Sequence, residues 1–324
     1  MIACASTDKL SLRVSVTDRC QLRCLYCMPE EGVEPCAHSD ILRYEEIERL
    51  VAFLKGHFNL TKVRITGGDP LVRANIETLV SMLSRMQIPD LALTTNAQVL
   101  ESRAERLKEA GLHRVNISLD SLHSDTFHRL TRGGELQRTI DGIRAAVRHG
   151  LTPVKLNMVV MRGVNDSEVK SMLAFALSEG CELRFLELMP AGMDRHEFDR
   201  HYVSCTEICS ALSPEFTIRP HAPRPGSTSR LHDAESPSHG RGRFGVITPT
   251  SHPFCSDCRR LRLTSDGYLV GCLARQKRVQ VRPLLAEDAV GREEALALAV
   301  QEAMGHKRED HVFEAPASMA RIGG

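Results

Sequence analysis

Three cysteines stand close together near the start of the chain, in the stretch CQLRCLYC that runs from Cys20 to Cys27. Cys20, Cys24 and Cys27 are separated by three and then two residues, and the next cysteine, Cys36, lies nine residues further on. Structural zinc is almost always held by four ligands. Three thiolates on one short loop can instead hold three irons of a [4Fe–4S] cluster and leave the fourth iron without a protein ligand. The spacing therefore predicts an iron–sulfur cluster with one open coordination position for a substrate.

A second triplet, Cys255, Cys258 and Cys272, lies in the stretch SHPFCSDCRRLRLTSDGYLVGC. A zinc site completed by His252 is one interpretation of these residues, because zinc accepts mixed cysteine and histidine ligands. The likeness to the first triplet favours a second [4Fe–4S] cluster, again with an open iron. The other cysteines show no such spacing and are predicted to be free thiols: Cys4, Cys36, Cys181, Cys205 and Cys209.

The overall composition excludes several classes of function. The 324 residues carry a formal net charge of +1, which gives no electrostatic footprint for nucleic acid or an anionic membrane. Trp is absent, which argues against a stacking platform for single strands, and no apolar run approaches a membrane span. The first ten residues do not resemble a signal peptide. A cytoplasmic protein is expected, and clustered cysteines in a reducing compartment indicate metal or redox sites.

Six strand-like segments alternate with helical patterns over the first two-thirds of the chain. Apolar residues recur at helical spacing over residues 44–58 and 75–86, and later helices are predicted to end at Gly111, Gly150 and Gly180. Strand, helix and strand repeated in this way predict a parallel sheet with helical crossovers. The predicted strands are 12–17, 62–68, 91–96, 114–120, 153–160 and 182–189.

Polar residues occur two apart within these strands, mostly toward their carboxyl ends, so each set lies on one face of its strand. Such a polar face must line a solvated or ligand-filled cavity, because burying it dry would be costly. We therefore expect an incomplete, open (β/α)6 barrel of the TIM type, with its active end at the carboxyl ends of the strands. A doubly wound sheet with scattered polar positions is the alternative. The polar sets are Arg13, Ser15 and Thr17; Arg64 and Thr66; Thr94 and Asn96; Asn116, Ser118 and Asp120; Lys155 and Asn157.

The repeating pattern stops before residue 219. Residues 219–243 are rich in Pro, Gly, Ser, Arg and His and are predicted to form a loop. A hairpin with Asp266-Gly267 at its turn and a last helix at about 292–306 follow. We expect two parts, a barrel over residues 1–218 and a C-terminal region over 219–324 that binds the second cluster and closes the open side of the barrel.

The stretch RITGGDP (Arg64–Pro70) follows the second strand, and its two glycines would let a ligand approach the backbone, although a plain tight turn is the alternative. The CxxxCxxC spacing with Tyr26, followed by GGDP, resembles the radical S-adenosylmethionine (SAM) superfamily. SVTDRCQLRCLYCMP, LTTN, VNISLDS, VKLNMVVMRGVND, LRFLELM, the FCxxCxRLRLTSDG block and the terminal IGG together resemble the GTP 3′,8-cyclase family of molybdenum cofactor biosynthesis. The resemblance covers nearly the whole chain and is weakest over residues 190–245.

This resemblance implies the cofactors and their ligands. A [4Fe–4S] cluster on Cys20, Cys24 and Cys27 would bind SAM at its open iron, and reduction would release a 5′-deoxyadenosyl radical. Contacts to SAM carry over to four positions of this chain: Tyr26, Gly68, Ser118 and Met189.

It also implies the substrate. The radical would take the 3′ hydrogen of GTP, and the carbon radical would attack carbon 8 of the guanine. A second [4Fe–4S] cluster on Cys255, Cys258 and Cys272 would bind the purine. Contacts to GTP carry over to Arg13, Arg64, Thr94, Lys155, Arg260 and Arg262, and catalytic roles to Arg260, Arg262, Gly323 and Gly324. Arg13, Arg64 and Lys155 also belong to the polar strand faces, and converging cations suit a triphosphate.

An electron donor and a cyclic pyranopterin monophosphate synthase that takes the product are the implied partners. The oligomeric state is left open, a homodimer included.

Two positions depart from the family pattern. Asp69 stands where the family usually has glutamate, which shortens the arm of a retained carboxylate. Ala97 replaces the glycine that usually follows TTN, which would be costly if the position needs a positive φ. The alternatives to a cyclase are another radical SAM enzyme with an auxiliary cluster and a non-enzymatic module that binds zinc through both triplets.

Overall fold

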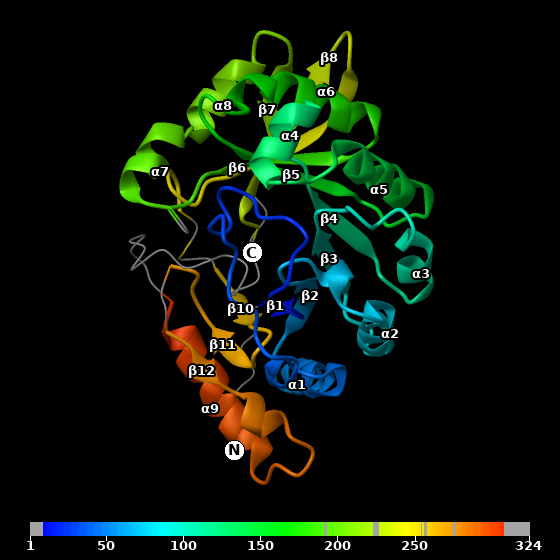
Figure 1. The fold of residues 1–324 in the computed structure, drawn as a ribbon, viewed down its shortest axis with the longest axis vertical. Helices are drawn as coiled ribbons and strands as arrows, with labels where there is room; N and C mark the ends of the chain where they lie inside the picture. The colour runs from blue at the N-terminus through cyan, green and yellow to red at the C-terminus, as the bar shows by residue number, and fades with distance from the viewer. Residues whose placement is uncertain are drawn as a thin grey trace.

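The computed structural model describes residues 9–190, 193–222, 227–253, 255, 258–274 and 277–307. Six parallel strands follow one another in chain order (Figure 1). They are β1 (Leu10–Ser15), β2 (Leu60–Thr66), β3 (Asp90–Thr95), β4 (Arg114–Ser118), β5 (Lys155–Val160) and β6 (Glu182–Glu187). A doubly wound sheet would reverse its strand order, so that alternative is wrong. The predicted α/β class with an open sheet is confirmed.

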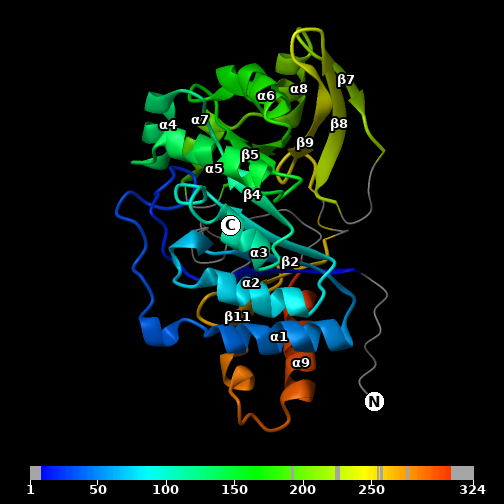
Figure 2. The same cartoon turned by 90° about the vertical axis from the view of Figure 1, so that its right-hand side faces the viewer.

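Helices connect these strands and pack on the outer face of the sheet, where α1, α2 and α3 lie side by side (Figure 2). The apolar stripe predicted for α1 is buried, including Ile47, Leu50, Val51 and Leu54. Gly111, Gly150 and Gly180 have the positive φ expected after their helices. The helices are α1 (Tyr44–His57), α2 (Ile76–Arg85), α3 (Ala104–Glu109), α4 (Ser124–Thr131), α5 (Leu136–Arg148), α6 (Val169–Ser178), α7 (Arg195–His201), α8 (Cys205–Leu212) and α9 (Arg292–Gly305).

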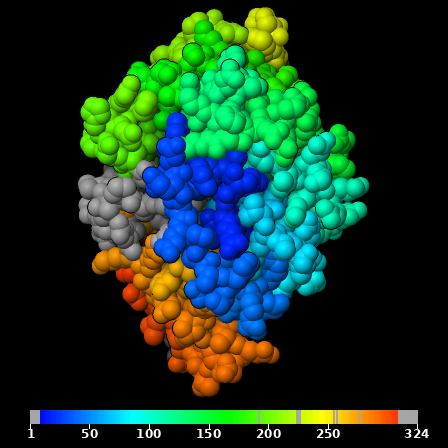
Figure 3. Space-filling view, viewed as in Figure 1, coloured from blue at the N-terminus to red at the C-terminus, as the bar shows by residue number. Residues whose placement is uncertain are grey.

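The C-terminal half extends the same sheet at both edges. β10 (Arg260–Leu263) runs parallel to β1, and β11 (Tyr268–Val270) and β12 (Val279–Gln280) continue antiparallel. The predicted turn between β10 and β11 is confirmed, with Gly267 at φ 86°. At the other edge, β9 (Gly240–Ile247) runs parallel to β6. Figure 3 shows the segment after β1 (blue) at the centre of one face, between the green part above and the orange C-terminal part below.

The loop predicted over residues 219–243 is wrong. This region contains most of an antiparallel meander of β7 (Thr217–Pro220), β8 (Ser229–Ser236) and β9. Its strands are exposed on one side, so polar residues and glycines dominate the composition, while Ala234, Phe244 and Val246 are buried on the other side. The alternation, and not the average polarity, carried the strand signal.

Within the described part of the chain, no helix is both long and apolar enough to cross a membrane.

Two helical glycines make a test of the packing. A Cβ at Gly142 of α5 would lie 2.8 Å from the carbonyl oxygen of Ala97, whereas a Cβ at Gly56 of α1 would meet nothing within 4 Å. Gly142→Ala should lower the free energy of unfolding by about 1–3 kcal/mol through overpacking. Gly56→Ala should raise it by about 0.5–1 kcal/mol, because alanine loses less backbone entropy in a helix. Chemical unfolding of the metal-free chain measures both, and equal effects would contradict the packing described here.

Candidate active site

Both cysteine triplets lie on the wall of one cavity of about 340 Å³, which also touches all six central strands or the residues that directly follow them. Each described residue proposed from sequence as a site residue lies on this wall, with the exception of Lys155. The wall includes Arg13, Cys20, Cys24, Tyr26, Cys27, Arg64, Gly68, Thr94, Ser118, Met189, Cys255, Cys258, Arg260, Arg262 and Cys272. Gly323 and Gly324 lie outside the described residues.

The turn at Gly68 and Asp69 holds the segment that leads to the first cysteine triplet against the end of β2. The backbone N–H of Gly68 donates to the carbonyl of Thr17 at 2.8 Å, and the N–H of Asp69 donates to that of Arg19 at 2.8 Å. A Cβ at Gly68 would lie 2.2 Å from the carbonyl oxygen of Arg19. The chain's own backbone therefore demands glycine at this position, in addition to any need of a ligand in the cavity.

Asp69 connects this turn to the end of β3. Its carboxylate accepts hydrogen bonds from the N–H of Leu71 at 2.9 Å, the hydroxyl of Thr95 at 2.7 Å and the N–H of Asn96 at 2.7 Å. Burial raises the pKa of Asp69 to about 6, although these donors oppose the shift. Asn96 in turn places its amide nitrogen 3.6 Å from the sulfur of Cys20. The shorter acid of GGDP thus orients a neighbour of the first triplet.

Ala97 adopts φ 63° directly after Asn96, so the position does lie in the left-handed region that glycine normally occupies. The backbone N–H of Ala97 donates to the hydroxyl of Thr95 at 3.0 Å, which helps to hold this conformation. The strain of this backbone, of order 1–2 kcal/mol for a residue with a Cβ, is carried by the surrounding packing.

Tyr26, beside Cys27, is fixed by a buried acid that sequence reasoning placed on the polar face but did not select. Its hydroxyl donates to Asp120 at 2.7 Å, and the N–H of Val159 donates to the other carboxylate oxygen at 2.8 Å. Burial raises the pKa of Asp120 to about 6, and these two donors offset part of the shift. Asp120 therefore joins the first cysteine loop to β4 and β5.

All three cysteines of each triplet line the cavity. Burial raises the pKa of Cys20 to about 12, so this thiol needs a bound cation to become a thiolate near neutral pH. No group of three or more His, Cys, Asp or Glu side chains in the described residues is placed to hold a metal ion. His252 is exposed and lies 3.0 Å from the hydroxyl of Ser251. Three thiols in each triplet are the right donor set for a [4Fe–4S] cluster with an open iron, and their role as ligands stays a prediction.

Arginines from three neighbouring strands gather on the cavity wall. Arg13 pairs in register with Arg262 on one side and with Arg64 on the other. Burial lowers the pKa of Arg13, and the positive charges of Arg262, Arg64 and Arg260 lower it further. The Nε of Arg64 is buried with no hydrogen-bond partner in the described structure. Such a group is expected to bind an anion.

Lys155 lies toward the amino ends of the strands, apart from the cavity wall, where it pairs with Glu182 at 3.0 Å. Burial lowers the pKa of Lys155 to about 8, with Arg184 as the next cause. Its predicted convergence with Arg13 and Arg64 on one cavity wall is therefore not found. Arg184, which sequence reasoning missed, lies on the wall instead. The period of two could have identified Arg184 from sequence, because Glu182 and Arg184 stand two apart on β6 and therefore share one face of the strand.

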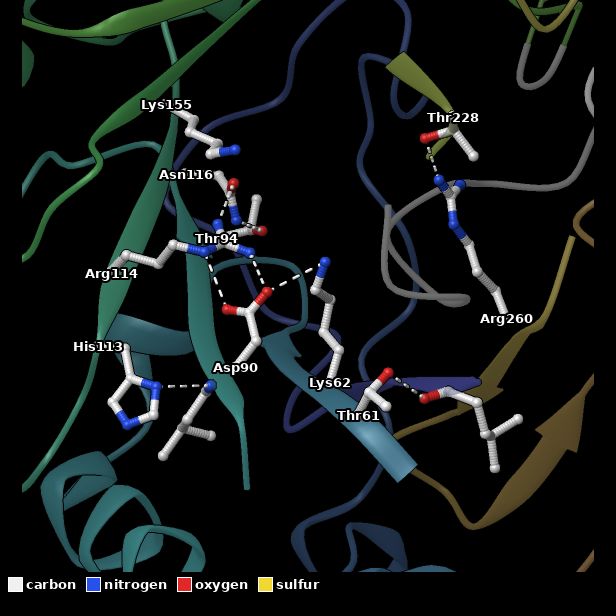
Figure 4. A network of polar contacts seen from close by, with 12 residues as sticks. Thr61, Lys62, Asp90, Thr94, His113, Arg114, Asn116, Lys155, Thr228 and Arg260 are labelled. Carbon is white, nitrogen blue, oxygen red and sulfur yellow. Dashed lines mark hydrogen bonds and ion pairs between the residues drawn. The ribbon is translucent and has the colours of Figure 1, made fainter. Parts of the chain in front are cut away.

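A network of polar side chains lies toward the amino ends of β2, β3 and β4 (Figure 4). Asp90 accepts two hydrogen bonds of 2.9 Å from Arg114 and an ion pair of 3.0 Å from Lys62. Burial alone would raise the pKa of Asp90, but Arg114 and Lys62 lower it to about 2. Asp90 and Glu182 balance only part of the positive charge of this interior.

Glu187 at the end of β6 holds the segment that leads to the second triplet, and it too was missed. Its buried carboxylate accepts hydrogen bonds from the N–H groups of Cys205 at 2.8 Å, Thr250 at 3.2 Å and Ser251 at 2.9 Å. Across the cavity, Arg260 donates to the hydroxyl of Thr228, which precedes β8 (Figure 4). The segment that leads into β8 is therefore in direct contact with β10, which begins two residues after Cys258.

This fold, with two cysteine triplets on one cavity, defines a radical SAM protein. Residues 14–176 match the family model described as Radical SAM superfamily, and residues 181–313 match the one described as Molybdenum Cofactor Synthesis C. The chain belongs to the GTP 3′,8-cyclase family. It is 42% identical to a GTP 3′,8-cyclase of Listeria welshimeri over 93% of this chain and 88% of the relative. It is also 42% identical to the one of Geobacter sulfurreducens, over 97% of this chain and 96% of that relative.

A solved structure agrees at the level of the fold. SuiB of Streptococcus suis, solved bound to S-adenosylmethionine, has a TM-score of 0.58 and 15% identity to this chain. The match covers 85% of this chain and 62% of SuiB. At this identity the likeness concerns the fold alone.

The buried carboxyl of Asp120 predicts a pH dependence. Its pKa of about 6 in the folded protein exceeds the ordinary value of 3.8, so the folded state binds the proton more tightly than the unfolded state. Its contribution to stability is therefore complete below about pH 4 and is lost as the pH rises through about 6. Asp120→Asn, which keeps partners for Tyr26 and Val159, should gain stability relative to the parent over this range.

Denaturant unfolding of the metal-free, reduced chain between about pH 4 and pH 7 checks this expectation. Asp125→Asn, at an exposed position of α4, is the matched control and should follow the parent. The same pH profile for Asp120→Asn and the parent would contradict it.

Proposed function

We propose that this protein is a radical SAM GTP 3′,8-cyclase, which converts GTP to (8S)-3′,8-cyclo-7,8-dihydroguanosine 5′-triphosphate in the first step of molybdenum cofactor biosynthesis. The observation that carries the proposal is the placement of both cysteine triplets and a row of arginines on one cavity, in a chain of this family. A cofactor site and a triphosphate site then share one cavity.

The first triplet would hold a [4Fe–4S] cluster with SAM, which when bound supplies a 5′-deoxyadenosyl radical. The chain's own residues would position the cofactor. Tyr26 is fixed by Asp120, Gly68 is fixed against the cysteine loop, and Ser118 and Met189 lie on the same wall. These four residues are the proposed SAM contacts. Exclusion of water from this cavity on binding of the substrate would protect a reactive intermediate from side reactions.

The second triplet would hold a second [4Fe–4S] cluster that binds the purine of GTP. Arg260 and Arg262 lie on β10, two and four residues after Cys258, and on the cavity wall. They are proposed to fix the substrate and to act in catalysis. Arg13, Arg64 and Thr94 are further proposed contacts, with Lys155 acting from the layer beneath. Gly323 and Gly324 are proposed to reach the cavity; Lys307, the last described residue before them, lies on its wall.

We further propose an incomplete (β/α)6 barrel over residues 1–218 and a region over 219–324 that closes its open side. The boundary falls inside β7, and one sheet runs through both parts, so this division is one of function. The proposed partners are a one-electron donor and a cyclic pyranopterin monophosphate synthase that takes the product. The proposed location is the cytoplasm, and a homodimer is compatible with the proposal.

The direct test is anaerobic. After cluster reconstitution and reduction, 5′-deoxyadenosine should form much faster with GTP than without it, and GTP should be consumed. Cys20→Ser should abolish cleavage of SAM, and Cys258→Ser should leave cleavage but remove its dependence on GTP. Cleavage that is indifferent to GTP in the parent would refute the substrate and favour another radical SAM enzyme with an auxiliary cluster.

Arg64 gives a separate test of the triphosphate site. Loss of a charged hydrogen-bond donor costs about 1.5–3 kcal/mol, which corresponds to a roughly 10–100-fold weaker Kd. Arg64→Met should therefore weaken binding of GTP to this extent and leave binding of guanosine nearly unchanged, as measured by equilibrium dialysis. Arg85→Met, at an exposed position of α2, is the control. An equal loss for GTP and guanosine would place Arg64 away from the phosphates.

A further inference from the structure

A lysine just after α9 bridges the two chain segments that carry the second cysteine triplet. The ammonium of Lys307 donates to the carbonyl of Arg260 at 2.7 Å and to the carbonyl of Gly271 at 2.9 Å. It also lies 3.6 Å from the sulfur of Cys258. Arg260 follows Cys258 by two residues, and Gly271 directly precedes Cys272. One side chain therefore fixes the spacing between two cysteines that are fourteen positions apart in the chain.

The end of α9 is held close enough for this contact by the backbone itself. A Cβ at Gly271 would lie 1.8 Å from the carbonyl oxygen of Ala303, so only glycine allows the last turn of α9 to approach here. The helix also contacts β11 and β12, beside which it lies in Figure 1. Because the helix end is fixed at Gly271, the position of Lys307 is determined by packing as well as by its hydrogen bonds.

The charge of Lys307 acts on the thiol beside it. Lys307 also lies on the cavity wall, on the side of the second triplet. A cation at hydrogen-bond distance from a ligand sulfur reduces the net negative charge of a cluster, and such contacts set both its retention and its reduction potential.

We propose that Lys307 is a positioning residue for the second cluster, which ties its two ligand segments together and raises its reduction potential. This inference rests on the proposed function, since it requires that Cys255, Cys258 and Cys272 hold a cluster. It concerns a residue that touches neither the first triplet nor the proposed SAM contacts, so its effect should be confined to the second site.

The experiment uses the full-length chain with Cys20, Cys24 and Cys27 replaced by Ser, so that only the second triplet can hold iron. In this background we compare Lys307→Met and Lys307→Arg with Lys277→Met, a matched control at an exposed lysine between Cys272 and β12. The measurements are iron and sulfide content, the rate of cluster loss to a chelator, the midpoint potential from an EPR-monitored titration, and thermal unfolding of the metal-free chain.

Lys307→Met should lose its cluster about 10–100-fold faster than the background, as expected when a partner of a metal ligand is removed. Its midpoint potential should become more negative, while Lys307→Arg and Lys277→Met stay close to the background. Unchanged cluster loss and potential in Lys307→Met would overturn the inference. An equal loss in Lys307→Arg would also overturn it, because that variant keeps the charge and the donors.

Two further outcomes distinguish a failure of the Lys307 inference from a failure of the proposed second cluster. A background chain that binds no iron would refute the second cluster itself, and the inference with it. If metal-free Lys307→Met unfolds at a lower temperature, Lys307→Gln decides, because it keeps a neutral donor for the carbonyls. A folded Lys307→Gln chain with the potential of the background would overturn the electrostatic part of the inference.

Discussion

Like charges buried side by side are the constraint on which the interior of this protein depends. Arg262, Arg13 and Arg64 occupy the same register on three adjacent strands, so the sheet brings three cationic side chains to one face. Burial and mutual repulsion lower the pKa of Arg13 and of Arg64. Such a row is tolerated because it borders a cavity and not a dry core, and it is relieved when an anion enters. This row of arginines is therefore the feature of the fold that the proposed triphosphate would neutralise.

The two cysteine triplets are held by backbone packing of the same kind. Gly68 allows the first loop to lie against β2, and Gly271 allows the end of α9 to lie against the second triplet. Buried carboxylates then fix what these contacts bring together: Asp69 and Asp120 beside the first triplet, and Glu187 on the segment before the second. The acids orient backbone N–H groups and side chains, so their charge is compensated within the protein.

The period of two in polar residues identified the cavity from sequence, because alternation along a strand determines which side chains share a face. Arg13, Arg64, Thr94 and Ser118 follow this rule. Asp120, Glu187 and Lys307 could not be selected in this way, because their roles come from contacts with residues distant in the sequence. The meander of β7–β9 was missed because its exposed faces give it the composition of a loop.

The pairing of β10 with β1 has a consequence for biosynthesis. β1 is made first, yet its neighbour on one side is separated from it by some 240 residues of chain, which gives the sheet contacts of long range. On the ribosome, that edge of β1 stays unpaired until most of the protein has been translated, and an unpaired edge is open to association with other chains. The segment that carries the second triplet also carries β10, so its synthesis supplies the strand that covers this edge of β1.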